Sequence, residues 1–142
     1  MNNQVETVVR RFERRDWLAA ALFFGVATLG YAVTRTRLAY LWDSVEFALA
    51  ITDYNITLSQ PHAPGYFLYV MLGRLVNVFV GDPQASLVWM SVVGGAGLVG
   101  VMYLLGTAMV GRATGVAAGL LTLTSPMVWF YSSVALTYVV DA

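Results

Sequence analysis

The chain has 142 residues, of which 58% are hydrophobic and 11% charged, with a mean hydropathy of +0.68. A soluble domain usually carries about a quarter charged residues, so this composition excludes an ordinary soluble protein and predicts an all-α integral membrane protein. The net charge is zero and there is no cysteine, which excludes a disulfide framework and a thiolate metal site. We expect the lipid bilayer, and no nucleic acid, among its partners.

The first apolar run covers residues 17–34 and is about long enough to cross a bilayer core. Four arginines precede it, at positions 10, 11, 14 and 15, whereas only Arg35 and Arg37 follow it. Because positive charge favours the cytoplasmic side, we expect residues 1–16 to be cytoplasmic and the chain after residue 34 to emerge on the outer face.

Two further apolar runs cover residues 85–110 and 113–131, and a short turn with Arg112 separates them. If Arg112 is cytoplasmic, a single crossing lies between residues 35 and 112, and 85–110 is the obvious candidate. The sequence thus predicts three transmembrane helices, a long first outer loop at 35–84, and a second outer loop that begins at 132–142.

Two amphipathic helices are expected inside the first outer loop, at about 43–53 and 64–80. The second contains Arg74 and Asn77 and is near the lower limit of length for a span. We interpret it as an interfacial helix in the outer headgroup region. A four-span alternative, in which 64–80 crosses the membrane, stays open.

Glycines recur at four-residue spacing in the third run, at Gly111, Gly115 and Gly119, and cluster in the second run between 94 and 100. Small residues so spaced let helices approach closely in lipid. They predict a packed helical bundle and carry no information about its function.

Asp43 and Glu46 stand three residues apart at the start of an apolar helical stretch. One interpretation is purely structural, with Asp43 capping the helix and Glu46 completing a capping box. The other is functional, because carboxylates at this spacing share a face, and Asp53 falls on about the same side. A carboxylate in a low-dielectric or like-charged environment is a plausible general base.

His62, the only histidine, lies in a turn between Pro61 and Pro64, directly before the 64–80 helix. It is either a solvated interfacial residue or part of a site that binds an anion at a helix N-terminus. Arg74 has a similar pair of interpretations. It reaches the headgroups as an anchor, or its guanidinium binds a lipid-borne phosphate.

The segments Trp-Asp-Ser-Val-Glu-Phe at 42–47 and Pro-His-Ala-Pro-Gly-Tyr at 61–66 resemble the first outer loop of polytopic GT-C glycosyltransferases. The likeness is to bacterial proteins of the protein O-mannosyltransferase-like group, although Ala63 and Phe67 replace prolines of the usual pattern. The resemblance covers about residues 17–142.

This resemblance implies an inverting glycosyltransferase that transfers a sugar from a polyprenyl-phosphate donor to a hydroxyl of a protein, lipid or glycan. Asp43 would be the catalytic base and Glu46 its companion. The expected donor-binding residues are His62, Tyr66, Arg74 and Asp141. Metal dependence stays open: oligosaccharyltransferase-like relatives use a divalent ion with such carboxylates, here Asp43, Glu46 and Asp141, whereas mannosyltransferase-like relatives do not.

Such enzymes have more spans than three, so we expect the chain to be the N-terminal part of a longer protein and to be inactive alone. A bacterial cytoplasmic membrane with the site on the outer face is the expected location. Two other classes remain, a non-catalytic membrane scaffold and part of a secondary transporter. The scaffold leaves Asp43, Glu46 and His62 unexplained, and a transporter would want ionisable groups near mid-bilayer.

Overall fold

The computed structural model describes residues 11–39 and 41–140. These residues form six α-helices and one short 3₁₀ helix, and no β-strand is found within them. The elements are α1 (Arg14–Thr34), α2 (Trp42–Thr52), η1 (Ile56–Leu58), α3 (Phe67–Val80), α4 (Pro83–Met109), α5 (Arg112–Thr124) and α6 (Pro126–Ser132). The expected all-α fold is therefore confirmed.

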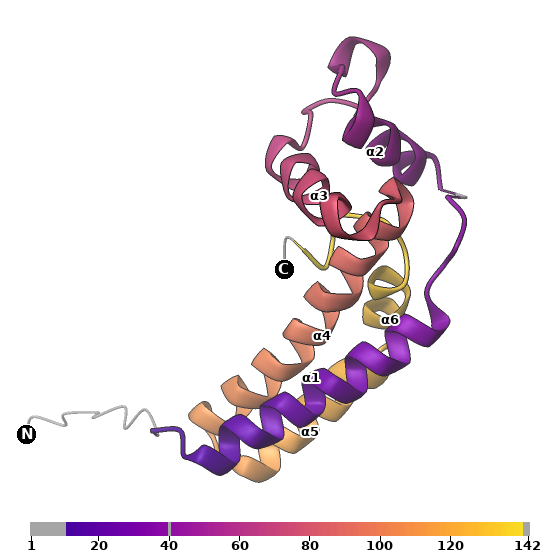
Figure 1. Cartoon of the computed structure of the whole chain (residues 1–142). Helices are drawn as coiled ribbons and strands as arrows, with labels where there is room; N and C mark the ends of the chain where they lie inside the picture. The colour runs from indigo at the N-terminus through magenta and orange to yellow at the C-terminus, as the bar shows by residue number, and fades with distance from the viewer. Residues whose placement is uncertain (1–10, 40, 141–142) are drawn as a thin grey trace, which may run out of the picture.

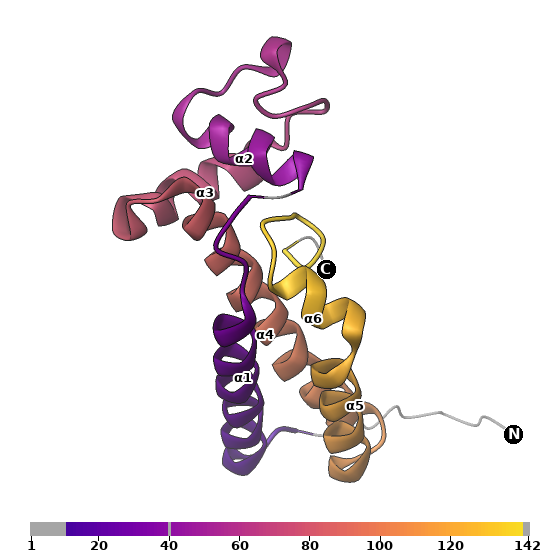
Figure 2. The same ribbon diagram turned by 90° about the vertical axis from the view of Figure 1, so that its right-hand side faces the viewer.

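Helices α1, α4 and α5 lie side by side as an elongated bundle (Figures 1 and 2). α1 and α4 run antiparallel, because Gly100 lies against Ala20 near one end and Gly95 lies against Tyr31 near the other. α4 and α5 are joined by a tight turn and also run antiparallel. Successive crossings in opposite directions are what the predicted order of spans requires.

Glycines make the contact between α4 and α5 possible. A Cβ atom added to Gly115 would lie 2.6 Å from the Tyr103 carbonyl oxygen and still closer to the hydroxyl of Thr107. A Cβ atom added to Gly106 on α4 would likewise lie 3.0 Å from the Cα atom of Gly115. The interpretation of these glycines as residues of close helix packing agrees with this geometry.

A buried ion pair joins the start of α1 to the start of α5. Asp16 is fully buried and accepts from two nitrogens of Arg112, at 2.6 Å and 3.2 Å. The same guanidinium lies 3.0 Å from Glu13, and hydrogen bonds from Arg15 and Arg112 lower the pKa of Glu13. Arg112 therefore lies at the same end of the bundle as the start of α1, as the three-span interpretation requires.

The third apolar run is not one straight helix. α5 and α6 meet at Ser125 with a bend of 60°, because Pro126 lacks the amide hydrogen that would continue the helix. By length and composition α1 and α4 are able to span a membrane, and the bent pair makes a third span if it is counted as one. The expectation of one continuous helix over 113–131 is thus corrected to a broken one.

α2 and α3 lie together across the far end of the bundle, over the start of α4 (Figures 1 and 2). α3 has 14 residues, which rise by only about 21 Å, less than the hydrocarbon core of about 30 Å. It begins at Phe67, so residues 64–66, expected in this helix, belong to the preceding loop. This short length favours three spans over the four-span alternative.

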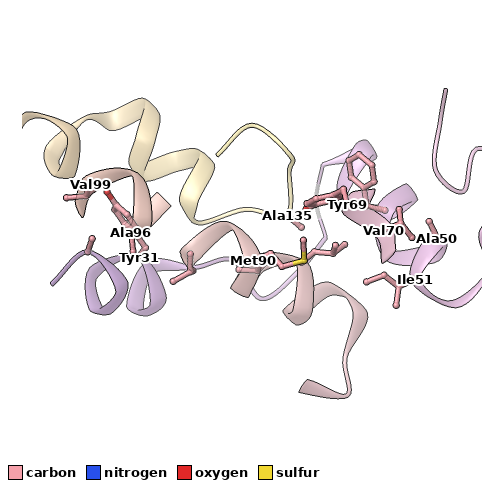
Figure 3. Packing of buried hydrophobic residues seen from close by; sticks show 14 residues of the cluster. Tyr31, Ala50, Ile51, Tyr69, Val70, Met90, Ala96, Val99 and Ala135 are labelled. Atoms are coloured by element: carbon pink, nitrogen blue, oxygen red, sulfur yellow. The ribbon is translucent and has the colours of Figure 1, made fainter. Parts of the chain in front are cut away.

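Two parts of one buried cluster hold this arrangement together (Figure 3). Along the bundle, Tyr31 of α1 packs near Ala96 and Val99 of α4. At the far end, side chains of α2, α3 and α4 meet, among them Ile51, Tyr69, Val70 and Met90. The core thus fixes α2 against α3 and α4 at this end of the bundle.

Candidate functional site

The first two turns of α2 carry the acidic pair, with Asp43 in the first turn. The helix begins at Trp42, and its N-cap is Leu41, which makes no capping hydrogen bond through its side chain. The structural interpretation, in which Asp43 is the cap, is therefore wrong: Asp43 lies inside the first turn. There its negative charge interacts favourably with the helix dipole, and its carboxylate remains available for other contacts.

Glu46 lies one turn further along α2 and is buried, with 6% of its surface exposed. Its Oε2 atom lies 2.5 Å from Nδ1 of His62, which comes from the loop before α3. Phe47 supports the imidazole, because its ring packs against His62, Tyr66 and Tyr69 at centroid distances of 5.0–5.6 Å. The buried carboxylate and the aromatic cluster thus hold the imidazole in place.

The loop that presents His62 is tightly built. Gly65 has a φ of +100°, and an added Cβ would lie 2.7 Å from both Ile56 and the Tyr54 hydroxyl. That hydroxyl donates a hydrogen bond of 2.9 Å to the Gly65 carbonyl. Only glycine fits this conformation and this space, so the Pro-Gly turn expected from the sequence does position the histidine.

Asp43, Glu46 and His62 form one cluster, in which a ligand atom from each lies within 4.8 Å of the others. Asp43 is the accessible member, and its carboxylate has no hydrogen bond or ion pair within residues 11–39 and 41–140. Asp53 does not join them. It follows the end of α2 as the C-cap and is exposed, so the expected group of three carboxylates reduces to two carboxylates and an imidazole.

A pocket of about 270 Å³ opens beside Asp43. Its walls are largely aromatic and combine polar with apolar surface, and they come from α2 with its N-cap, α6 and the segment after α6. The lining residues are Leu41, Trp42, Asp43, Phe130, Tyr131, Leu136 and Tyr138. Concave sites with aromatic walls and a few placed polar groups are typical of small-molecule binding.

Buried hydroxyl groups fix the far wall of this pocket. The Ser44 hydroxyl donates to the Ala135 carbonyl at 2.8 Å, and the Ser91 hydroxyl donates to the Leu136 carbonyl at 3.2 Å. These bonds tie the segment after α6 to α2 and α4, although some 90 residues separate Ser44 from Ala135 in sequence. Tyr138 thereby lines the same pocket as Asp43, and its ring centroid lies 4.6 Å from that of Tyr131, with the two planes tilted by 46°.

The other predicted site residues divide into three cases. Tyr66 belongs to the cluster, since its ring centroid lies 5.2 Å from that of His62. Arg74 does not, because it contacts the opposite end of α2, where it donates to the Ala50 carbonyl at 3.1 Å. Its Nε atom is buried without a hydrogen-bond partner among the described residues. Asp141 lies outside the described residues.

A second, apolar hollow of about 370 Å³ lies between α3, α4 and Val140. Its walls carry almost no polar surface, and they include Trp89, whose ring faces the Arg35 guanidinium at 4.9 Å. The remaining lining residues are Leu72, Val76, Met90, Val93 and Gly94. A chain-like hydrocarbon group fits such a lining better than a polar ligand does.

Sequence reasoning missed the aromatic wall of the pocket. Phe130, Tyr131 and Tyr138 stand about 90 residues after Asp43, and no local spacing links them to it. Ser44 was likewise read only as part of a motif, although it anchors the wall. The aromatic residues at the end of the last apolar run were the one available signal.

Comparison with known families gives one match, and no curated protein or solved structure matches the chain. The match covers residues 43–142, more than half of the chain, and begins at Asp43 itself. It includes the acidic pair, the histidine turn and the aromatic segment that line the site. With its two or three helices able to span a membrane, the chain is an integral membrane protein with a glycosyltransferase-like family assignment. The chain belongs to the family described as the protein O-mannosyl-transferase TMEM260 N-terminal domain.

Proposed function

We propose that this chain carries the general base and part of the donor site of an inverting membrane glycosyltransferase. The donor is a polyprenyl-phosphate-linked sugar, with mannose the first choice given the family name. The acceptor is a hydroxyl of a protein, lipid or glycan. The reaction takes place on the outer face of a bacterial cytoplasmic membrane, where α2 and α3 lie against the headgroups.

The observation that carries this proposal is the environment of Asp43. Its carboxylate is accessible, has no cationic partner among the described residues, and faces a pocket with aromatic walls. A sugar ring offers apolar C–H faces to such walls and hydroxyls to such a carboxylate. Family membership supports a transferase in general, and the geometry around Asp43 supports this residue as its base.

The proposed step is a single displacement. The acceptor oxygen bonds to the anomeric carbon while its proton passes to Asp43, and the bond from that carbon to the phosphate oxygen breaks. The electron pair of the broken bond leaves with the polyprenyl phosphate, and the configuration at the anomeric carbon inverts. Glu46 contributes by holding His62, and His62 and Tyr66 lie beside the base, on the side from which we expect the donor phosphate to approach.

The lipid part of the donor requires a separate surface. The hollow between α3 and α4 is apolar and lies on the same end of the bundle as the site, so it is suited to a polyprenyl chain. Arg74 is also on α3, and its unpartnered Nε supports the interpretation that it binds the donor phosphate. One Nη atom already bonds the end of α2, so Arg74 has a structural role as well.

The test is Asp43→Asn in the full-length protein, with transfer measured from defined polyprenyl-phosphate sugars. Asparagine keeps the shape of aspartate and removes its basicity, so we expect the rate to fall by at least about a hundredfold. Glu46→Gln should cost less, because it acts through His62. Asp53→Asn, an exposed carboxylate at the other end of the same helix, is the matched control and should leave the rate unchanged.

A further inference from the structure

We propose that Asp43, Glu46 and His62 bind one divalent cation of the manganese or zinc class. The first support is the donor set, two carboxylates and one imidazole within 4.8 Å of one another. Ligand atoms on a common ion at about 2.0–2.2 Å lie within roughly 4.4 Å of each other. Small rotations of the side chains therefore bring the three groups to bonding distance.

Charge gives the second support. Two carboxylates share the site, and apart from His62 no described cationic side chain is paired with either of them. Arg74 is turned to the other end of α2, and Arg35 lies over Trp89. A bound cation would offset the repulsion between the carboxylates, which His62 does only when protonated.

Burial gives the third support. The Glu46 side chain is 8% exposed, and rings of Phe47 and Tyr66 pack around the imidazole. Such an apolar shell limits water and strengthens charge interactions inside it. Asp43 instead opens toward the aromatic pocket, which leaves room for further ligands such as water or a phosphate oxygen.

The donor set also decides the class of ion. A carboxylate-only site would suit Mg²⁺ or Ca²⁺, whereas an imidazole ligand favours Zn²⁺ and related transition metals. We expect Zn²⁺ to bind more tightly than Mn²⁺, and Mg²⁺ the most weakly. In this proposal the third ligand is His62, whereas the sequence suggested Asp141 as the third ligand of a divalent ion. The second oxygen of Asp43 remains available to an acceptor hydroxyl, and a bound cation would stabilise the charge of a leaving phosphate.

Binding is measured on the purified full-length protein in detergent, without donor or acceptor, so its outcome is independent of the transfer reaction. Isothermal titration calorimetry with Zn²⁺ and with Mn²⁺ should show one ion at this site. The affinity should fall at least about tenfold in His62→Gln and in Glu46→Gln. Asp53→Asn is the control and should bind as the wild type does. The proposal would be overturned if the wild type bound no ion at this site. It would also be overturned if His62→Gln and Glu46→Gln bound the ion as tightly as the wild type does.

A second measurement needs no change at His62, and its first part uses the wild-type protein alone. His62 is the only histidine of the 142 residues, and modification by diethyl pyrocarbonate at this residue can be followed by peptide mass analysis. Saturating Zn²⁺ should slow its modification in the wild type, and the protection should be lost in Asp43→Asn. Modification of His62 at the same rate with and without Zn²⁺ would show that the imidazole is not a ligand.

Discussion

The two ends of the helical bundle each carry a cluster of charged side chains, and the clusters differ in how they are balanced. At one end Asp16 is fully buried and is matched by two nitrogens of Arg112. At the other end Glu46 is buried against His62, and Asp43 remains accessible with no partner among the described residues. The second cluster borders a pocket with polar and aromatic walls.

This difference indicates that the two clusters have different roles, one in stability and the other in the proposed reaction. A buried charge that is fully paired is held for packing, since it has no free group to offer a ligand. An accessible carboxylate without an ion-pair partner among the described residues has its oxygen atoms available to a ligand. The Asp16–Arg112 pair therefore holds α1 to α5, whereas we propose that the Asp43 cluster binds the donor and takes part in the reaction.

The largest expected effect is a difference in thiol labelling, because the two ends of the bundle should lie on opposite sides of the membrane and labelling is all or none. Single cysteines at Thr57 and Asp82, both exposed in the segment that carries α2 and α3, should react with an impermeant thiol reagent from outside intact cells. A cysteine at Thr114, exposed at the other end, should react only after permeabilisation. Labelling of Asp82→Cys only after permeabilisation would show that α3 crosses the membrane.

Breaking the paired cluster should lower stability without touching the site. Arg112→Gln removes the two-pronged partner of the buried Asp16 carboxylate and should lower the free energy of unfolding. Partial exposure of the Arg112 side chain limits the loss. Thermal unfolding in detergent measures the loss, and adding Asp16→Asn should recover part of it by removing the buried charge. A variant as stable as the wild type would refute this role of the pair.

The glycine contact between α4 and α5 gives a smaller effect with a close control. Gly115→Ala places a methyl group against the backbone of α4, and such overpacking costs about 1–3 kcal/mol. Gly97→Ala adds the same atom on α4 where nothing lies within 4 Å, so stability should be unchanged or slightly higher. Equal unfolding temperatures for the two variants would contradict the close packing.

Much of this fold could be predicted from the sequence because lipid imposes simple length and charge rules. The spans at α1 and α4, the short helix α3 and the position of Arg112 followed from apolar length and arginine placement. The break at Pro126 was missed because hydropathy does not register a lost backbone hydrogen bond. The family resemblance assigned Glu46 and His62 to the same site, but the sequence did not predict their direct contact. The tyrosine wall depends on contacts between residues about 90 positions apart, which no local spacing reveals.

The central claim is that the Asp43 cluster takes part in sugar transfer, whereas the Asp16–Arg112 pair stabilises the helical bundle. The most direct test is to measure transfer rate and thermal unfolding together for Asp43→Asn and Arg112→Gln in the full-length protein. We predict that Asp43→Asn loses at least about a hundredfold in rate with its unfolding temperature nearly unchanged. Arg112→Gln should unfold at lower temperature and retain its rate per folded molecule. Near wild-type transfer by Asp43→Asn would contradict the account.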